Sequence, residues 1–376
     1  MKKIFKMIGI SILSIFGLLA IATALFVNLS PQFGKAPSNA QKEEFAKTDH
    51  YADGKFINHS ESPMKVNLKK AIKELTAKRP NRRPKAVIPP LKLDSLEIVE
   101  HPDSISQLTW FGHSSFLVQI DGLNLLLDPM LSQVPAPHPW LGQNRYANEL
   151  PIEIAKLPEI DAVIFSHDHY DHLDYESILK LKEKVNHFYV PLGLGSHLAY
   201  WGVEQSKITE LDWWQSVNYK GLEFICTPSR HFSGRGLFDR ASTLWASWVI
   251  KGKKDNIYFS GDSGYDTHFK EIGEKYGPFD IALLECGQYN EDWKYIHMMP
   301  EETAQAAVDL QAKLAMPIHW GAFTLAYHDW MEPVERMTKK AKELNVNVAT
   351  PRVGEVLQLK SSHIPQEKWW EAFMHL

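Results

Sequence analysis

Cysteine is scarce in this chain of 376 residues, which contains only Cys226 and Cys286. Each stands in an apolar run that predicts a β-strand, and a free cysteine in such a place behaves as a small hydrophobic side chain. We therefore expect two buried thiols, and neither a disulfide nor a thiol nucleophile. Cysteine content does not identify the compartment.

A strong charge of either sign is also lacking. Lysine and arginine number 41 against 45 acidic residues, a formal net charge of −4. A dedicated nucleic-acid binder would show a basic excess, so we expect no nucleic-acid partner. Internal repeats and low-complexity tracts are absent too. With 44% hydrophobic and 23% charged residues, the chain is an ordinary globular protein with one large domain or two average ones. Its excesses are 17 histidines and 12 tryptophans.

The N-terminus predicts a membrane segment. Residues 1–6 carry three lysines, and residues 7–27 form an uncharged apolar run. About 20 apolar residues span a bilayer as a helix. Positive charge ahead of the run keeps the N-terminus cytoplasmic, which makes the following domain extracytoplasmic. We expect an uncleaved anchor; the alternative is a signal peptide, for which residues 22–24 offer a weak cleavage pattern.

Residues 28–105 are expected to be a linker and a basic extension. Asn28–Asp49 is rich in polar residues and proline, which favours a loop. Met64–Lys78 predicts a short helix, and prolines follow it. Lys65–Lys92 holds ten lysines and arginines against one acid. This arm either wraps the domain in solvent or approaches anionic lipid at a membrane surface.

Residues 106–360 form the expected main domain, and residues 361–376 form a C-terminal tail. We expect the Glu367–Met374 end of this tail to pack on the domain and not to face lipid. Strand-like runs come early and helices are interspersed later, which favours an α/β layered fold. Residues 108–120 are expected to form two strands joined by a glycine turn. The other expected strands are 123–127, 161–165, 188–191, 222–227, 244–250, 256–260, 281–285 and 315–320, and the expected helices are 175–184, 301–314 and 331–344.

A dense cluster of metal-binding side chains follows the strand 161–165. His167, His169, Asp171 and His172 fall within six residues. Side chains alternate along an extended segment, so His167 and His169 point the same way. Three imidazoles and a carboxylate suit a divalent metal far better than a core. The cluster therefore predicts a metal site.

Further ligands should come from the ends of later strands. His231, Asp262 and His319 each follow an apolar strand and stand beside a glycine-containing loop. Binding residues concentrate on such loops because a rigid scaffold positions them. We expect these three side chains to join the cluster.

The complete pattern resembles the metallo-β-lactamase superfamily and, within it, the enzymes of the N-acyl-phosphatidylethanolamine phospholipase D type. The resemblance covers Ser106 to Leu359. The matching stretches are Ser166–Asp174, Pro191–Leu194, Glu210–Trp214, Leu244–Trp248, Gly261–Tyr265, Tyr276–Asp280, His297–Glu302 and Ile318–Gly321. It implies a four-layer αββα sandwich with the metals at one edge between the sheets.

The resemblance also implies how the ligands are shared between two zinc ions, although other divalent metals are possible. One ion would take His167, His169 and His231, the other Asp171, His172 and His319, with Asp262 bridging. Asp128 matches an early motif and would support the histidine loop without binding metal. Such a pair of ions would activate water for attack on phosphorus or a carbonyl carbon. Asp171 would orient it, and His297 would contact the substrate or assist the leaving oxygen.

Three aromatic residues, Tyr170, Tyr289 and Trp293, are candidate substrate contacts, although core packing explains them as well. Ile296 and the segment 285–288 depart from the animal enzyme's pattern, so the shape of the pocket is open. A phospholipid diesterase is the first hypothesis. A lactonase or esterase on a small soluble substrate and a non-enzymatic membrane-anchored binding module are the alternatives. Oligomeric state is not fixed, and a homodimer is one option.

Overall fold

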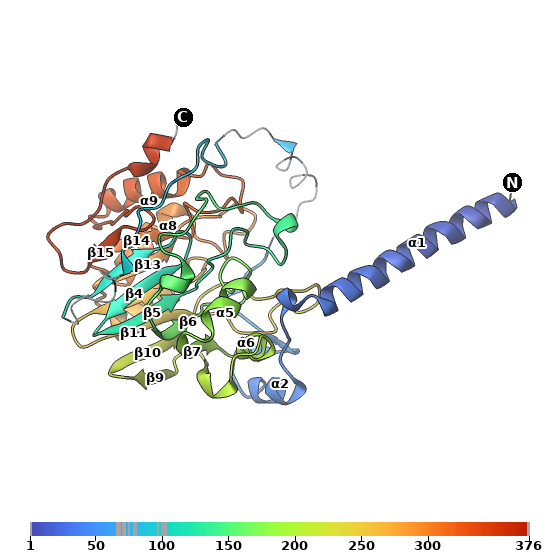
Figure 1. Cartoon of the computed structure of the whole chain (residues 1–376), viewed down its shortest axis with the longest axis horizontal. Helices are drawn as coiled ribbons and strands as arrows, with labels where there is room; N and C mark the ends of the chain where they lie inside the picture. The colour runs from blue at the N-terminus through green and yellow to red at the C-terminus, as the bar shows by residue number, and fades with distance from the viewer. Residues whose placement is uncertain are drawn as a thin grey trace.

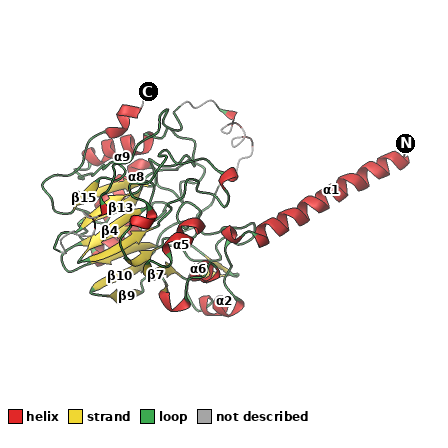
Figure 2. Ribbon diagram, in the orientation of Figure 1, coloured by secondary structure: helices red, strands yellow, loops and turns green. Residues whose placement is uncertain are grey.

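Two β-sheets face each other at the centre of the domain (Figures 1 and 2). The computed structural model describes residues 2–64, 69, 73, 76–77, 81–95, 98 and 104–373. The first sheet has the strand order β15 (Val356–Gln358), β3 (Gln107–Trp110), β4 (Phe116–Ile120), β5 (Leu123–Leu127), β6 (Ile160–Ile164), β7 (Val185–Pro191), β8 (Ile208–Leu211). The second has the order β14 (Ala315–Ile318), β13 (Ile281–Glu285), β12 (Asn256–Phe259), β11 (Ser247–Lys251), β10 (Leu222–Thr227), β9 (Ser216–Tyr219).

Both sheets are mixed, and their parallel halves carry the functional loops. Strands β5 to β8 pair in parallel, as do β12 to β14, whereas the remaining neighbours are antiparallel. Parallel strands end at the same edge of a sheet, so the loops after β6, β12 and β14 can gather at one end of the sandwich. The antiparallel hairpin β4–β5 turns at Asp121–Gly122, as the sequence predicts.

Helices cover the outer face of each sheet. α5 (Tyr175–Leu181) and α6 (Gly195–Tyr200) lie on the first sheet, and α7 (His268–Tyr276), α8 (Pro300–Asp309) and α9 (Glu332–Glu343) lie on the second. The alternation of side chains in β5 shows the layering: Leu125 and Leu127 join the core between the sheets, whereas Leu126 joins the core beneath α5 and α6. The predicted αββα sandwich is confirmed.

The segment before the sandwich is more ordered than the sequence suggests. The expected loop 28–49 contains α2 (Asn39–Phe45), which begins because the Ser38 hydroxyl accepts from the Gln41 backbone N–H and the Gln41 side chain bonds back to Ser38. Phe45 and Phe56 then enter the core between the sheets. Phe56 belongs to β2 (Lys55–Phe56), which pairs with β1 (Tyr51–Ala52). The expected helix 64–78 falls largely outside the described residues.

Helix α1 (Lys2–Leu29) projects away from the body and buries none of its residues in the protein (Figure 1). Its length and composition suffice to cross a membrane, and a membrane anchor and a signal sequence both share this property. At the other end of the chain, the short helix η5 (Trp369–Phe373) packs on the domain, with Trp369 and Trp370 buried. The prediction that the C-terminal end packs is confirmed.

Short 3-10 helices occupy the connections: η1 (Pro31–Phe33), η2 (Pro139–Leu141), η3 (Ile154–Lys156) and η4 (Gln205–Lys207). Helix α8 ends at Asp309, five residues before the expected end, because Gln311 adopts a left-handed conformation with φ 56°. Cys226 and Cys286 are both buried and free, as predicted.

Candidate metal centre

The predicted ligands meet at the edge of the sandwich where both sheets end. The loop His167–His172 follows β6 of the first sheet, and His231, Asp262 and His319 follow β10, β12 and β14 of the second. Gly261 makes the approach of the two sheets possible. Its φ of 54° is left-handed, and a Cβ at this position would stand 2.4 Å from the Cβ of Ser166. The site therefore joins the two halves of the fold.

The first group of side chains consists of His167, His169, His231 and Asp262. The Nδ1 atom of His169 lies 2.9 Å from Nε2 of His167 and 3.2 Å from Nε2 of His231. Oδ2 of Asp262 lies 3.9 and 3.8 Å from the same two Nε2 atoms. Imidazole nitrogens and a carboxylate oxygen converging in this way form a set of ligands that zinc prefers.

The second group consists of Asp171, His172, His319 and His113. Oδ2 of Asp171 lies 3.5 Å from Nε2 of His172 and 3.9 Å from Nε2 of His319. The other oxygen of Asp262, Oδ1, faces this group, 3.2 Å from Nε2 of His172 and 3.0 Å from Nδ1 of His319. Asp262 thus stands between the two groups, with one oxygen toward each.

His113 was not among the predicted ligands. It lies in the turn between β3 and β4, fully buried, with its Nε2 atom 2.9 Å from Oδ2 of Asp171. The sequence contains a signal for it, because His113 follows an apolar strand and stands beside a glycine-containing turn, as the other strand-end residues do. The signal is weak because this turn precedes the dense cluster by more than fifty residues.

The chemical state of these side chains fits bound cations. Burial lowers the pKa of His167 and His231 well below the ordinary value, which leaves both imidazoles neutral with a lone pair to donate. Burial alone would raise the pKa of Asp262, but the neighbouring His172 and His319 hold it well below its ordinary value. Among the described residues, Oδ1 of Asp262 and Nε2 of His172 lie close to each other but make no hydrogen bond of acceptable geometry, and Nδ1 of His113 is buried without a partner. Leaving such atoms unpartnered costs about 1–3 kcal/mol each, which a cation would offset.

Asp128 supports the site from behind. Its carboxylate accepts hydrogen bonds from the Ser166 backbone N–H at 2.7 Å and the Ser166 hydroxyl at 2.5 Å, and its Oδ2 lies 2.7 Å from Nδ1 of His172. A carboxylate in this position holds the proton on Nδ1 and directs Nε2 toward the metal. This placement agrees with the supporting role that the sequence predicts.

A cavity of about 240 Å³ opens onto both groups. Its floor includes His169, Asp171, Asp262 and His319, and its walls are largely apolar; the wall residues are Met64, Phe232, Gln288, Trp293, Ile296, His297 and Leu325. The combination of a charged floor and apolar walls suits a substrate with one polar reacting group and an apolar remainder.

His297 lines this cavity with a carboxylate behind it. Its Nδ1 atom lies 3.2 Å from Oε1 of Glu285, which is fully buried and also accepts from the Met298 backbone N–H at 2.9 Å. Burial raises the pKa of Glu285 to about 7. Burial would lower the pKa of His297, but the Glu285 carboxylate outweighs it and the pKa is raised. A histidine oriented by a carboxylate in this way is suited to proton transfer.

The three predicted substrate contacts are placed differently from one another. Trp293 lines the cavity, as does Ile296. Tyr170 donates its hydroxyl proton to the Arg235 carbonyl and stacks beneath the Arg235 guanidinium, 4.1 Å from its ring centre. Tyr289 is buried, with its hydroxyl 2.6 Å from Glu332. Among the described residues, Tyr170 and Tyr289 serve packing and do not line this cavity.

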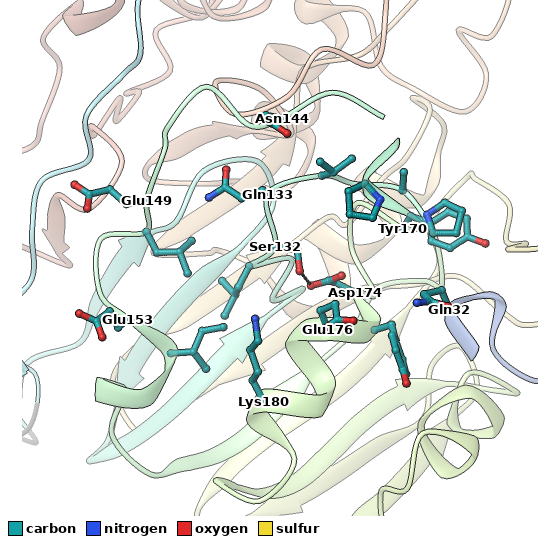
Figure 3. Close-up of a pocket in the computed structure, with 18 of the residues that line it drawn as sticks. Gln32, Ser132, Gln133, Asn144, Glu149, Glu153, Tyr170, Asp174, Glu176 and Lys180 are labelled. Atoms are coloured by element: carbon teal, nitrogen blue, oxygen red, sulfur yellow. Dashed lines mark hydrogen bonds between the residues drawn. The ribbon is translucent and has the colours of Figure 1, made fainter. Parts of the chain in front are cut away.

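Tyr170 instead borders a larger cavity of about 680 Å³, shown in Figure 3. Asp174 points into this space but already accepts from the Ser132 hydroxyl at 2.6 Å and caps α5 through the Ser177 backbone N–H at 3.0 Å. The cavity is lined by no histidine among the described residues. Because Asp174 is engaged in capping α5 and no candidate metal ligand lines the larger cavity, the smaller cavity over the two ligand groups is the candidate active site.

The layered fold and the two groups of histidine and aspartate define a metal-dependent hydrolase. Comparison with known proteins makes the assignment specific: a family model described as a beta-lactamase superfamily domain matches residues 123–320. The chain belongs to the metallo-β-lactamase superfamily, and its His/Asp groups are typical of that superfamily's two-metal sites.

Relatives and solved structures agree with this assignment. The chain is 42% identical to an uncharacterized protein of Mycobacterium tuberculosis over 329 residues, 85% of this chain and 87% of the relative. It is 33% identical to the N-acyl-phosphatidylethanolamine-hydrolyzing phospholipase D 1 of Caenorhabditis elegans over 251 residues, 63% of this chain and 70% of the relative. A metallo hydrolase of Ignicoccus hospitalis shares the fold at 21% identity, with a TM-score of 0.51 over 69% of this chain and all of that one.

Proposed function

We propose that the chain is a membrane-anchored, dinuclear zinc phosphodiesterase of phospholipase D type that cleaves N-acyl-phosphatidylethanolamine or a related phospholipid. The observation that carries the proposal is the cavity, in which two ligand groups sharing Asp262 form the floor and Phe232, Trp293 and Leu325 stand among the apolar walls. The relative in Caenorhabditis elegans supports the substrate class. The apolar helix α1 would keep the site beside membrane lipid.

The proposed ligand sets are those that the family resemblance implies, and the two groups of converging side chains support them. His167, His169 and His231 would hold one ion and Asp171, His172 and His319 the other, with Asp262 between them. A pair of bound zinc ions supplies charge stabilisation for the phosphoryl oxygens and a water acidic enough to react near neutral pH.

The chain's own residues would do the rest. Asp171 stands on the cavity floor, where its carboxylate can orient the attacking water and hold its proton. Glu285 fixes His297 through Nδ1, which leaves Nε2 to give a proton to the departing oxygen. The apolar walls around them would exclude bulk water from the reacting group.

A substrate panel tests the reaction. Full-length protein in detergent micelles with zinc is offered N-acyl-phosphatidylethanolamine, bis-(p-nitrophenyl) phosphate and a set of lactones. We expect turnover of the two phosphodiesters. Turnover of lactones alone would overturn the phosphodiesterase, and metal-loaded protein without any turnover would favour a binding module.

One observation favours the second candidate, a lactonase or esterase acting on a small soluble ester. The cavity of about 240 Å³ lies below the range of roughly 300–1,000 Å³ that is usual for pockets holding drug-sized ligands. A phospholipid would have to leave its acyl chains outside this space, whereas a small ester would fit within it. The same panel separates the two activities.

Replacing His297 tests its proton-transfer role. His297→Gln should lower kcat about 100-fold or more, the range for loss of a positioned acid or base, and should leave the metal content unchanged. His187→Gln is a matched control, because the ring of this half-buried histidine bonds the Thr209 hydroxyl near the start of β7, away from both ligand groups. Loss of metal from His297→Gln would reassign His297 as a ligand.

A further inference from the structure

Four large apolar side chains surround the end of α1 without being covered. They lie on η2 and on the loop 236–239, and their exposed fractions are 71% for Trp140, 48% for Leu141, 61% for Leu237 and 96% for Phe238. We call these four residues the apolar collar. Large exposed apolar side chains that gather on one part of a folded domain usually mark a contact site.

The collar is attached to the last turns of α1. The Phe26 ring of α1 lies 5.0 Å from the His138 ring and 5.9 Å from the Trp140 ring. On the opposite flank, Leu237 and Phe238 share a cavity of about 790 Å³ with Ala20, Ala24 and Val27 of the helix. Both halves of the collar therefore lie beside the last turns of α1.

The level of these last turns is set by the sequence of α1. The uncharged run 7–27 rises about 30 Å as a helix, which equals the thickness of the hydrocarbon core. A helix inserted along this run places Phe26 at the boundary between acyl chains and headgroups. Trp140, held beside Phe26, is then at the depth where tryptophan is enriched in membrane proteins.

Hydrogen bonds fix the segment after α1 to the domain, so the domain cannot swing away from the end of the helix. The Trp201 indole N–H donates to the Pro31 carbonyl at 2.7 Å, and the Arg235 guanidinium donates twice to the Gln32 carbonyl, at 3.1 and 2.7 Å. The Lys35 backbone N–H donates to Nδ1 of His197 at 2.9 Å. These bonds hold the collar beside the helix.

We propose that the apolar collar inserts into the headgroup region of the bilayer that holds α1 and fixes the orientation of the catalytic domain on the membrane. The inference rests on the membrane anchor of the proposed function. The occupant of the collar is lipid, and a second copy of the chain is an outcome that the test distinguishes.

Depth-dependent quenching tests the collar. Full-length variants Trp140→Cys and Phe238→Cys are labelled with an environment-sensitive fluorophore and reconstituted into phosphatidylcholine vesicles. The native Cys226 and Cys286 are fully buried and stay unlabelled in the folded protein. Lipid carrying a spin label near the headgroup should quench both positions and shift their emission to the blue. Unchanged thermal unfolding verifies that each variant is folded.

Two further positions make the result decisive. Lys339→Cys is the aqueous control, since this exposed residue is on α9, which Figure 1 places on the opposite side of the body from α1. Ile12→Cys reports on the anchor and should be quenched by a deep spin label. If the label at position 12 is quenched while the labels at positions 140 and 238 behave like the one at position 339, the proposed insertion of the collar is wrong and the membrane anchor is supported. Without quenching at 12 the anchor itself fails. A blue shift that depends on the ratio of protein to lipid, without quenching by the spin label, would show that the collar contacts a second copy of the chain and not lipid.

Discussion

The two carboxylate oxygens of Asp262 face two different groups of ligands. Oδ2 faces the group built on His167 and His231, and Oδ1 faces the group built on His172 and His319. A carboxylate that meets ligands on both sides is buried at little cost only if cations balance it. The geometry of a single side chain therefore argues for two ions and not one.

Asp128→Asn tests whether the residue behind His172 tunes the metal site. The amide is uncharged and offers one acceptor oxygen in place of two, so it cannot keep the carboxylate's bonds to both Ser166 and Nδ1 of His172, and the orientation and basicity of that imidazole should suffer. We expect zinc affinity to fall about 10–100-fold, measured by competition with a chromophoric chelator. Asp161→Asn is the control, because Asp161 also accepts a backbone N–H, from Asn124 at 3.0 Å, but lies near the start of β6. Equal affinities for Asp128→Asn and the unaltered protein would contradict the supporting role.

His113→Ala tests the residue that completes the second group. Without its imidazole, Asp171 loses the partner 2.9 Å from its carboxylate, and we expect the second ion to be held more weakly while the first is retained. Metal analysis after gel filtration measures the stoichiometry. Cobalt-substituted protein adds an absorption spectrum that responds to the ligand set. Full retention of both ions with an unchanged spectrum would show that His113 only packs against the site.

At the residue level, the sequence predicts most of the side chains in the site, but not all of them. The cluster 167–172 was recognisable because its ligands are adjacent in the chain, and His231, Asp262 and His319 because each ends a strand. Only the fold shows that the turn holding His113 reaches Asp171, since that contact links two distant segments. Tyr289 was a candidate contact because aromatic residues line pockets and cores alike, and sequence does not distinguish the two settings.

At the scale of elements, the ligand loop after β6 is held by one buried arginine. Nη1 of Arg235 donates to the carbonyls of Asp168 and Leu173 at 2.6 and 2.7 Å, while its other nitrogens bond Gln32 just beyond α1. The Asp168 carboxylate adds bonds from the Thr243 hydroxyl at 2.9 Å and the Gly234 backbone N–H at 2.7 Å. The Arg235 side chain therefore holds both the ligand loop after β6 and the segment that follows α1.

Arg235→Ala should be strongly destabilising. The buried carbonyls of Asp168 and Leu173 and the partly buried carbonyl of Gln32 would lose their donors, at about 1–3 kcal/mol for each buried group, so we expect the free energy of unfolding to fall by about 3 kcal/mol or more. Denaturant titration followed by tryptophan fluorescence measures it. Arg83→Ala is the control, since this exposed arginine makes one long bond of 3.4 Å to the Asn144 carbonyl and should stay within about 0.5 kcal/mol. Similar losses for the two variants would refute the central place of Arg235.

Elements were predictable where the periodic pattern was strong. Leu222–Thr227 and Ile281–Glu285 form strands with the expected bounds, because apolar runs buried on both faces are continuous. Helix α2 was missed because its stability comes from the Ser38 cap and the burial of Phe45 in the core, and its seven residues show no helical periodicity. The early end of α8 depends on the conformation of Gln311, which composition does not determine.

At the scale of the whole molecule, the ligands tie two sheets together. The loop after β6 and the turn after β3 belong to one sheet, and His231, Asp262 and His319 belong to the other. Bound ions would therefore act as cross-links across the sandwich. Because ions bind only the folded arrangement, their free energy of binding adds to the stability of the fold, by about 4 kcal/mol at a thousandfold excess over Kd.

Chelation should accordingly lower the unfolding temperature of the full-length protein. We expect EDTA to shift the thermal transition downward by several degrees and re-added zinc to restore it, followed by circular dichroism. The double variant His167→Ala with Asp262→Ala should lack bound zinc and should unfold at the same temperature with and without chelator. A double variant that keeps full metal occupancy would refute the assigned ligands.

The division of the ligands between two sheets also orders events during biosynthesis. His319 follows β14, the last strand of the second sheet in chain order, so the second ligand group is incomplete until most of the chain has been made and β14 has paired with β13. If the domain is threaded unfolded across a membrane behind α1, as the sequence leads us to expect, this pairing would be completed only on the far side. There the ions available, in the affinity order that favours copper and zinc over manganese and iron, would determine the occupant. The metal recovered with the protein would then record the compartment in which the chain folded.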